Sequence, residues 1–184
     1  MHFLRYCETN TTKHLPRVAS AAEAIRNIPV NEPPKMPKGA TKLPDAIVAP
    51  CETPVAMFHA EGAQVYECKA SADGKLAWQF REPIATLFLD GKTVGRHYAG
   101  PSWEHIDGSA VIAKVTGSAP GASAKDLDLV KLAVSANRGS GVLTGVTTVQ
   151  RINTCGGKLA GACKQAGAFE SVPYAADYVF LKKS

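Results

Sequence analysis

The sequence has no apolar run near the roughly 18 residues that a membrane-spanning helix needs. It has no C-x-x-C pair and no cysteine–histidine spacing typical of a zinc site. It also lacks a strand–G-x-G-x-x-G–helix unit, a G-x-S-x-G elbow, and a basic stripe with interleaved aromatic residues. We therefore expect no membrane span, no cofactor and no nucleic-acid partner.

No ordinary signal peptide is predicted from the opening MHFLRYCETNTTKHLPR, because this stretch has no continuous apolar core and no small-residue cleavage site. The net charge of +5 is unevenly divided, with +3 in residues 1–45 and +2 in the remainder. The main part of the chain is therefore close to electrically balanced.

What the chain does contain fits one globular domain preceded by an arm. Its 184 residues are 45% hydrophobic, enough for a core without help from a metal. Residues 1–42 are predicted to form the arm and a proline-rich linker, with one short helix over residues 17–28. Residues 43–184 are predicted to form a single β domain.

The most informative regularity is the dipeptide Asp-Gly, which occurs at 73–74, 90–91 and 107–108, each seventeen residues after the last. Asp-Gly is favoured in tight hairpin turns because the central residues need positive φ. Each occurrence predicts a strand–turn–strand unit. The intervening REPIA and GPS segments are expected to separate the units, giving about six antiparallel strands.

Further strands are predicted from alternation and from β-branched composition. They cover AQVYECKA at 63–70, the segment around 129–135, GVLTGVTTVQRINT at 141–154 and AADYVFLKK at 175–183. The predicted fold class is all-β, an antiparallel sandwich or a partly closed barrel built from Asp-Gly hairpins.

Five cysteines lie at positions 7, 51, 68, 155 and 163. Cys7 falls in the predicted arm, and the other four allow two disulfides in three connectivities. Cys68 on a strand and Cys163 on a loop are one candidate long-range pair. Free buried thiols in a reducing compartment are the alternative.

Four segments resemble domain-of-unknown-function family 3455, whose members occur in bacteria and fungi, often behind a secretion signal. They are GAQVYECKA, the run from WQFREPIATLF through DGKTVGRHYAGPSWEHIDGSAVIAKV, GVTTVQRINTCGGKLAGAC, and VPYAADYVFL. The resemblance runs from about Leu43 to Leu181. It implies an all-β protein located outside the cytoplasm, a cytoplasmic location being the alternative.

Some members of that family carry a malate dehydrogenase label, which this chain does not support because it lacks the dinucleotide-binding glycine motif. The chain also departs from the family pattern in KLAVSAN, where an apolar strand rich in tryptophan and leucine is usual. A leader peptide, usual in the family, is not evident either.

The candidate site lies in GRHYAGPSWEHIDGS, residues 95–109, where Gly100-Pro101 reverses the chain between two strands. This hairpin brings His97 or Tyr98 close to Trp103 or Glu104. Trp103 or Tyr98 would provide a stacking surface, with His97 and Glu104 as hydrogen-bonding or proton-transfer groups. The alternative is that the aromatic rings are core residues while the charged groups face water.

Arg151 in QRINTCGGK is a candidate for contacting an anionic ligand or Glu104, and an ion pair with Asp177 or Glu104 is its structural alternative. Metal binding needs three or four converging ligands, and the candidates are His97, His105 and Asp107. Their spacing is not diagnostic of a metal site.

These features rank three hypotheses. The first is an exported, non-enzymatic module that binds a small or carbohydrate-like ligand. The second is an acid–base or metal-dependent enzyme that uses His97, Glu104 and Arg151. The third is a structural or envelope protein that engages a protein partner. The sequence does not predict the oligomeric state.

Overall fold

The computed structural model describes residues 43–183, and the predicted arm, linker and short helix over 17–28 lie outside the described residues. The described part begins with a one-turn 3-10 helix and continues as eight strands. They are η1 (Asp45–Ile47), β1 (Glu52–Ala70), β2 (Leu76–Leu89), β3 (Lys92–Tyr98), β4 (Ser102–His105), β5 (Ala110–Ala119), β6 (Leu129–Arg138), β7 (Thr148–Gly156) and β8 (Phe169–Lys183).

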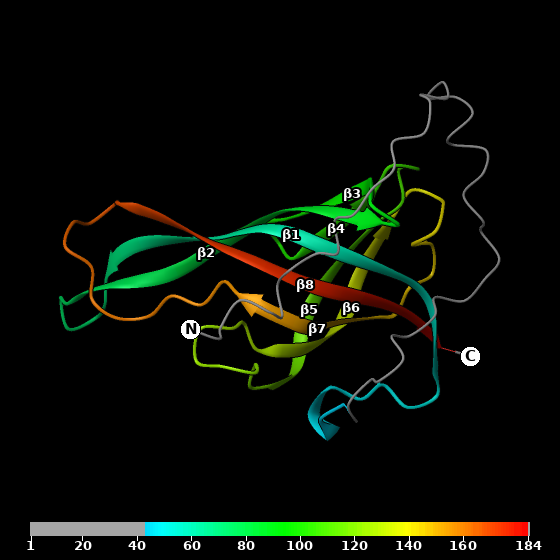
Figure 1. Cartoon of the computed structure of the whole chain (residues 1–184), viewed down its shortest axis with the longest axis horizontal. Helices are drawn as coiled ribbons and strands as arrows, with labels where there is room; N and C mark the ends of the chain where they lie inside the picture. Colours follow the sequence, from blue (N-terminus) through cyan, green and yellow to red (C-terminus); the bar gives the residue numbers. More distant parts are fainter. Residues whose placement is uncertain (1–42, 184) are drawn as a thin grey trace, which may run out of the picture.

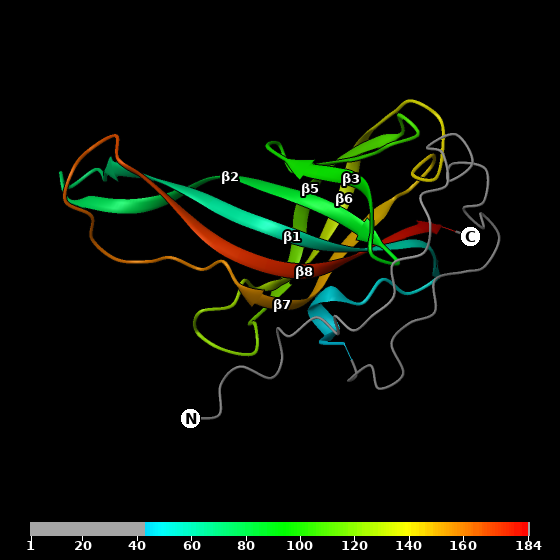
Figure 2. The ribbon, with the colours of Figure 1, turned by 45° about the horizontal axis from the view of Figure 1, so that its top comes forward.

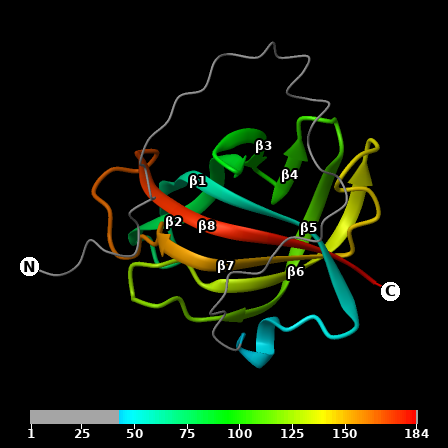
Figure 3. The same cartoon turned by 45° about the vertical axis from the view of Figure 1, so that its right-hand side comes forward.

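The eight strands form one antiparallel sheet in which each strand pairs with the next along the chain. The last strand, β8, pairs with the first over residues Glu52 to Glu67, so the sheet closes into a barrel (Figure 3). The all-β antiparallel prediction is confirmed. Of the two architectures predicted, the structure has the barrel, and its closure is complete. Within residues 43–183, no helix is long and apolar enough to cross a membrane.

The three Asp-Gly dipeptides all lie at hairpin turns, as predicted. They connect β1 to β2, β2 to β3 and β4 to β5, while Gly100-Pro101 connects β3 to β4. At the second turn both Asp90 (φ 50°) and Gly91 (φ 73°) have positive φ, as a two-residue type I′ turn requires.

The predicted break at REPIA is wrong, because residues 81–85 continue β2 without interruption. The three Asp-Gly turns therefore produce five strands rather than about six, with β2 shared by two hairpins. Pro83 pairs with Gln64 on β1, whereas β3 joins β2 only from Ala85 onward. A proline is tolerated here because its missing N–H would face the side of β2 that lies beyond the end of β3.

The barrel interior holds the main apolar core. Its members are almost wholly buried and come from every strand and from the loop before β7. Near the carboxyl end of β8 the interior is filled by aromatic and aliphatic side chains: Phe58, Phe180, Leu143 and Val146.

A second, smaller apolar cluster lies on the outer face, where the segment 43–49 packs against β6, β7 and β8. Ile47 of η1 is fully buried there. Its carbonyl oxygen accepts a hydrogen bond of 2.6 Å from Gln150 Nε2, and Lys131 Nζ donates to the Val48 carbonyl. Gly117 of β5 lets the segment approach this closely, since a Cβ at that position would overlap the Ala46 carbonyl oxygen.

The long strands β1, β2 and β8 extend well beyond the others and form a projection on the left of Figures 1 and 2. The loop that connects β7 to β8 returns along this projection and is tied to it by the Cys68–Cys163 disulfide. The predicted pair is therefore present. The prediction that Cys51 belongs to one of two disulfides is wrong, because Cys51 is a free, exposed thiol.

The disulfide should contribute substantially to stability, because its cysteines are 95 residues apart. We expect a Cys68→Ala/Cys163→Ala double variant to lose about 2–4 kcal/mol of unfolding free energy, measured by guanidinium denaturation. Cys51→Ser, which removes only the free thiol, is the control and should change stability by less than about 0.5 kcal/mol. Equal denaturation midpoints for the double variant and the parent would contradict this prediction.

Candidate functional site

The β3–β4 hairpin divides the predicted site residues between the two faces of the sheet. Its register places His97 opposite Trp103 and Arg96 opposite Glu104. Because successive side chains on a strand alternate between faces, His97 and Trp103 point into the barrel and Tyr98 and Glu104 point outward. The structure therefore does not bring all five candidate residues together.

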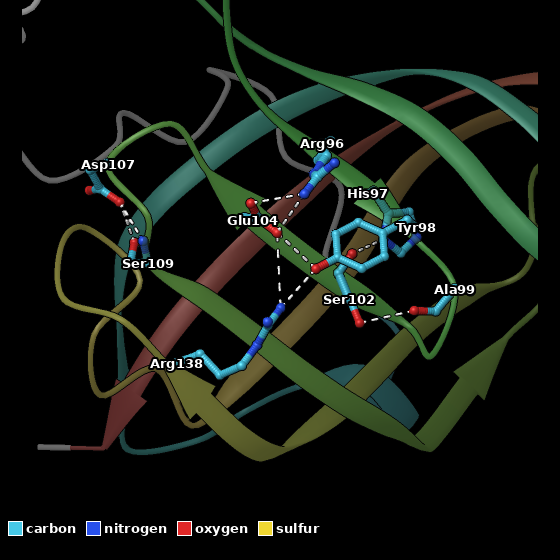
Figure 4. Close-up of polar contacts among 9 residues, drawn as sticks. All are labelled: Arg96, His97, Tyr98, Ala99, Ser102, Glu104, Asp107, Ser109 and Arg138. Atoms are coloured by element: carbon cyan, nitrogen blue, oxygen red, sulfur yellow. Dashed lines mark hydrogen bonds and ion pairs between the residues drawn. The ribbon is translucent and has the colours of Figure 1, made fainter.

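On the outer face, Glu104 is the centre of a polar cluster (Figure 4). Arg96 Nη2 donates to both Glu104 carboxylate oxygens at 3.0 and 3.1 Å, and the Tyr98 hydroxyl donates to Oε2 at 2.9 Å. Arg138 Nη2 donates to the Tyr98 hydroxyl oxygen at 2.8 Å. The hydrogen bonds from Tyr98 and Arg96 lower the pKa of Glu104, so the group is ionised and fully engaged. This arrangement ties neighbouring strands together.

On the inner face, His97 stacks on Trp103 with ring centroids 4.4 Å apart and an interplanar angle of 9°. Tyr178 of β8 packs at a tilt against both rings. His97 Nδ1 lies 2.8 Å from the Ser102 carbonyl oxygen, and a carbonyl only accepts, so Nδ1 carries the proton. Nε2 is then the acceptor nitrogen, and it has no hydrogen-bond partner among residues 43–183.

Burial holds the pKa of His97 at about 3, against an ordinary value of 6.5. The hydrogen bond with Ser102 opposes this shift and the nearby Arg151 charge adds to it. His97 is therefore a neutral imidazole at any physiological pH. It can accept a hydrogen bond through Nε2, but it is a poor general base because proton affinity falls with pKa.

Arg151 of β7 also points into the barrel, between Tyr178 on β8 and Val130 on β6. Its Nε and Nη2 atoms donate to the Asp128 carbonyl oxygen at 3.1 and 2.9 Å. The predicted ion pair with Asp177 or Glu104 is absent among the residues described. Asp177 instead lies against His59 and Asn153 on the outer face.

These inward residues line a cavity of about 210 Å³ that reaches into the barrel and is open to solvent on one side. His97, Trp103 and Arg151 all contribute to its wall, so three of the five predicted site residues share one cavity. The rest of the wall is mostly apolar and aromatic: Tyr66, Phe80, Pro83, Pro101, Val115, Leu127, Val130, Leu132 and Tyr178, with the polar Gln64. Phe80 and Val115 are each more than half exposed, which places the mouth of the cavity near them.

Two buried donors in the cavity wall lack hydrogen-bond partners within residues 43–183. They are the indole Nε1 of Trp103 and the amide Nε2 of Gln64. A buried donor without a partner costs about 1–3 kcal/mol. Neither Gln64 nor Tyr178 was predicted from the sequence as a site residue. The signal for Gln64 was available, because it shares the buried face of β1 with Tyr66 and Cys68.

The candidate metal ligands do not converge. Nowhere in the described part of the chain do three or more histidine, cysteine, aspartate or glutamate side chains gather in a way that could hold a metal ion. His105 Nδ1 lies 3.0 Å from Asp107 Oδ2, while His97 is committed to Ser102. The metal hypothesis based on His97, His105 and Asp107 is therefore not supported by their positions.

Asp107 instead organises a loop. Its Oδ1 accepts hydrogen bonds from the backbone N–H and the hydroxyl of Ser109 (Figure 4), and its Oδ2 accepts one from the Val142 N–H. Burial alone would raise the pKa of Asp107, but these hydrogen bonds outweigh it and lower the pKa to about 2. The ionised carboxylate holds the loop before β7 against the β4–β5 turn.

A family model described as "Protein of unknown function (DUF3455)" matches residues 49–182. The chain belongs to this family. The match covers the eight strands except the last residue of β8, and it includes every cavity-lining residue named above, so the cavity lies within the DUF3455 domain. A search of curated proteins found no match, and a search of solved structures found none.

The buried neutral His97 should make the stability of this DUF3455 domain depend on pH. Between about pH 6.5 and pH 3 the unfolded chain binds a proton at His97 that the folded chain does not. Stability should therefore fall as the pH falls, with His97 contributing at most about 1.4 kcal/mol per pH unit. His97→Gln should make the fall between pH 6 and pH 4 shallower by about that amount, measured by urea denaturation at each pH.

His59→Gln is the matched control for this experiment. A hydrogen bond to Asp177 is the main cause of the raised pKa of His59, and partial burial opposes it. His59 is therefore protonated in both the folded and the unfolded chain below pH 6, and its loss should leave the slope unchanged. Parallel slopes for the parent and His97→Gln would show that His97 is not the titrating group.

Proposed function

We propose that this protein is a binding module that holds a small, largely apolar molecule inside its barrel. The cavity that contains His97, Trp103 and Arg151 is the observation that carries the proposal. Small-molecule sites are characteristically concave, mostly apolar and furnished with a few oriented polar groups. Here the polar groups are the Arg151 guanidinium, the amide of Gln64, the indole N–H of Trp103 and the acceptor nitrogen of His97.

The size of the cavity favours a compact ligand. Its volume of about 210 Å³ is below the usual range for drug-sized ligands. An apolar cavity of about 150 Å³ is enough to hold benzene. A single ring with one or two substituents is therefore the appropriate size. A carbohydrate fits less well, because each of its hydroxyl groups needs a polar partner and the wall is mainly apolar.

The same geometry weakens the enzyme hypothesis, which needed His97 and Glu104 as an acid–base pair. The two side chains lie on opposite faces of the sheet, and His97 has a pKa of about 3.

We also propose that the protein is exported. The Cys68–Cys163 disulfide is consistent with an extracellular location, because disulfides persist in oxidising compartments.

Trp103 provides a direct reporter of binding. In a Trp78→Phe background it is the only tryptophan left, since the chain has two. We expect benzyl alcohol, benzamide or benzoate to change the Trp103 emission in a saturable manner, and to raise the melting temperature by mass action. If none of these single-ring compounds changes either signal, the proposed function is wrong.

A variant that fills the cavity tests whether the ligand binds there. Val130→Phe should abolish the response, because Val130 is buried and lines the cavity. Ile84→Phe is the matched control, since Ile84 is exposed and does not line it. It should bind as the parent does. Undiminished binding by a folded Val130→Phe variant would place the ligand elsewhere on the protein.

A further inference from the structure

Among residues 43–183, Arg151 contributes the only formal charge in the cavity wall. No aspartate or glutamate of this part of the chain lines the cavity, and His97 is held neutral by burial. The remaining wall residues are apolar, aromatic or uncharged polar side chains. An anion entering the cavity would therefore meet one positive charge and no negative charge.

The guanidinium of Arg151 has no carboxylate partner among residues 43–183. It donates to the carbonyl oxygen of Asp128 through Nε and Nη2, and it also has a hydrogen bond with the Tyr178 hydroxyl, so part of its five N–H groups is already used. The nearby carboxylates are engaged elsewhere. That of Asp128 accepts from Lys158 Nζ at 2.8 Å, and that of Asp126 accepts from the Gly156 N–H at 2.7 Å.

Arg151 is half-buried and has no counter-ion among residues 43–183, so an anion entering the cavity would gain a charge-assisted contact with it. A carboxylate suits the planar guanidinium, because the two groups form parallel charge-assisted hydrogen bonds. The unpartnered donors of Trp103 and Gln64 favour the same kind of ligand, since both need an acceptor. Arg151, Trp103 and Gln64 thus each offer a donor to an acceptor group on the ligand.

Building on the proposed function, we infer that the ligand is a single-ring carboxylate, whose carboxylate is bound by Arg151 and whose ring lies against the apolar wall. Val130 and Leu132 of β6 supply that wall beside Arg151, and Trp103 and Tyr178 supply its aromatic part. The acceptor nitrogen of His97 is free to bind a hydroxyl substituent on the ring.

Benzoate and benzamide test the inference directly, because they have similar shapes and differ in charge. Titrated into the full chain with the Trp78→Phe reporter, benzoate should bind at least about tenfold more tightly than benzamide. Equal affinities would overturn the inference and leave the proposed function standing, provided that Val130→Phe still abolishes both. Binding of none of the single-ring probes would instead be a failure of the proposed function itself.

Variants of Arg151 then test whether this side chain causes the preference for benzoate over benzamide. Arg151→Met should remove the difference between benzoate and benzamide, and Arg151→Lys should restore part of it. Arg96→Met is the matched control, because Arg96 lies on the outer face and pairs with Glu104. It should keep the full preference. A folded Arg151→Met that still prefers benzoate overturns the inference. If Arg151→Met does not fold, the affinities of benzoate and benzamide for the parent and for Arg151→Lys test the inference instead.

Discussion

Pairing between the first and last strands is the constraint on which the rest of this structure depends. Because β8 pairs with β1 along most of its length, the sheet has an interior and an exterior, and every strand must place alternate side chains on each. Closure of the sheet therefore divides the side chains of the β3–β4 hairpin between an inner and an outer face. His97 and Trp103 enter a low-dielectric interior, whereas Tyr98 and Glu104 remain on a solvated face.

The interior is packed unevenly, and that unevenness creates the candidate site. Phe58, Phe180 and Leu143 fill the end near the carboxyl terminus of β8. Trp103 contacts Phe180 on one side and borders the cavity on the other. A ligand in this cavity would therefore lie against the stacked rings of His97 and Trp103.

Local pattern predicted much of this fold. The Asp-Gly turns and the strands over residues 63–70 and 175–183 follow from patterns among neighbouring residues, and they were predicted correctly. The strand predicted over residues 141–154 begins only at Thr148, because turns occupy the residues before it. The pair Cys68–Cys163 was identified as a candidate. Closure of the sheet was not fully predicted, because pairing between β1 and β8 joins residues more than 100 positions apart. REPIA was misread as a break because Pro83 is compatible with a strand only where one side of that strand lacks a partner.

The candidate site was also predicted only in part, because local patterns do not show how distant strands pair. Alternation showed that His97 and Tyr98 must point in opposite directions, but not which of them points inward. Arg151 was a candidate for an anionic ligand, with an ion pair to Asp177 or Glu104 as the alternative. Its position opposite Tyr178 and Val130 is set by the register of three strands, which no local pattern encodes.

The side of β2 that has no partner strand could allow two copies of the protein to pair edge to edge. A closed barrel has no free sheet edge, but the projecting part of β2 extends past β3 and would expose one. At its tip the returning loop covers this edge, with Trp78 N–H donating to the Gly161 carbonyl and Cys163 N–H to that of Leu76. Over the remaining stretch, Pro83 removes a donor, and Arg81 and Glu82 place charges beside it. A strand from another copy would therefore find no continuous row of backbone groups to extend along this edge of β2.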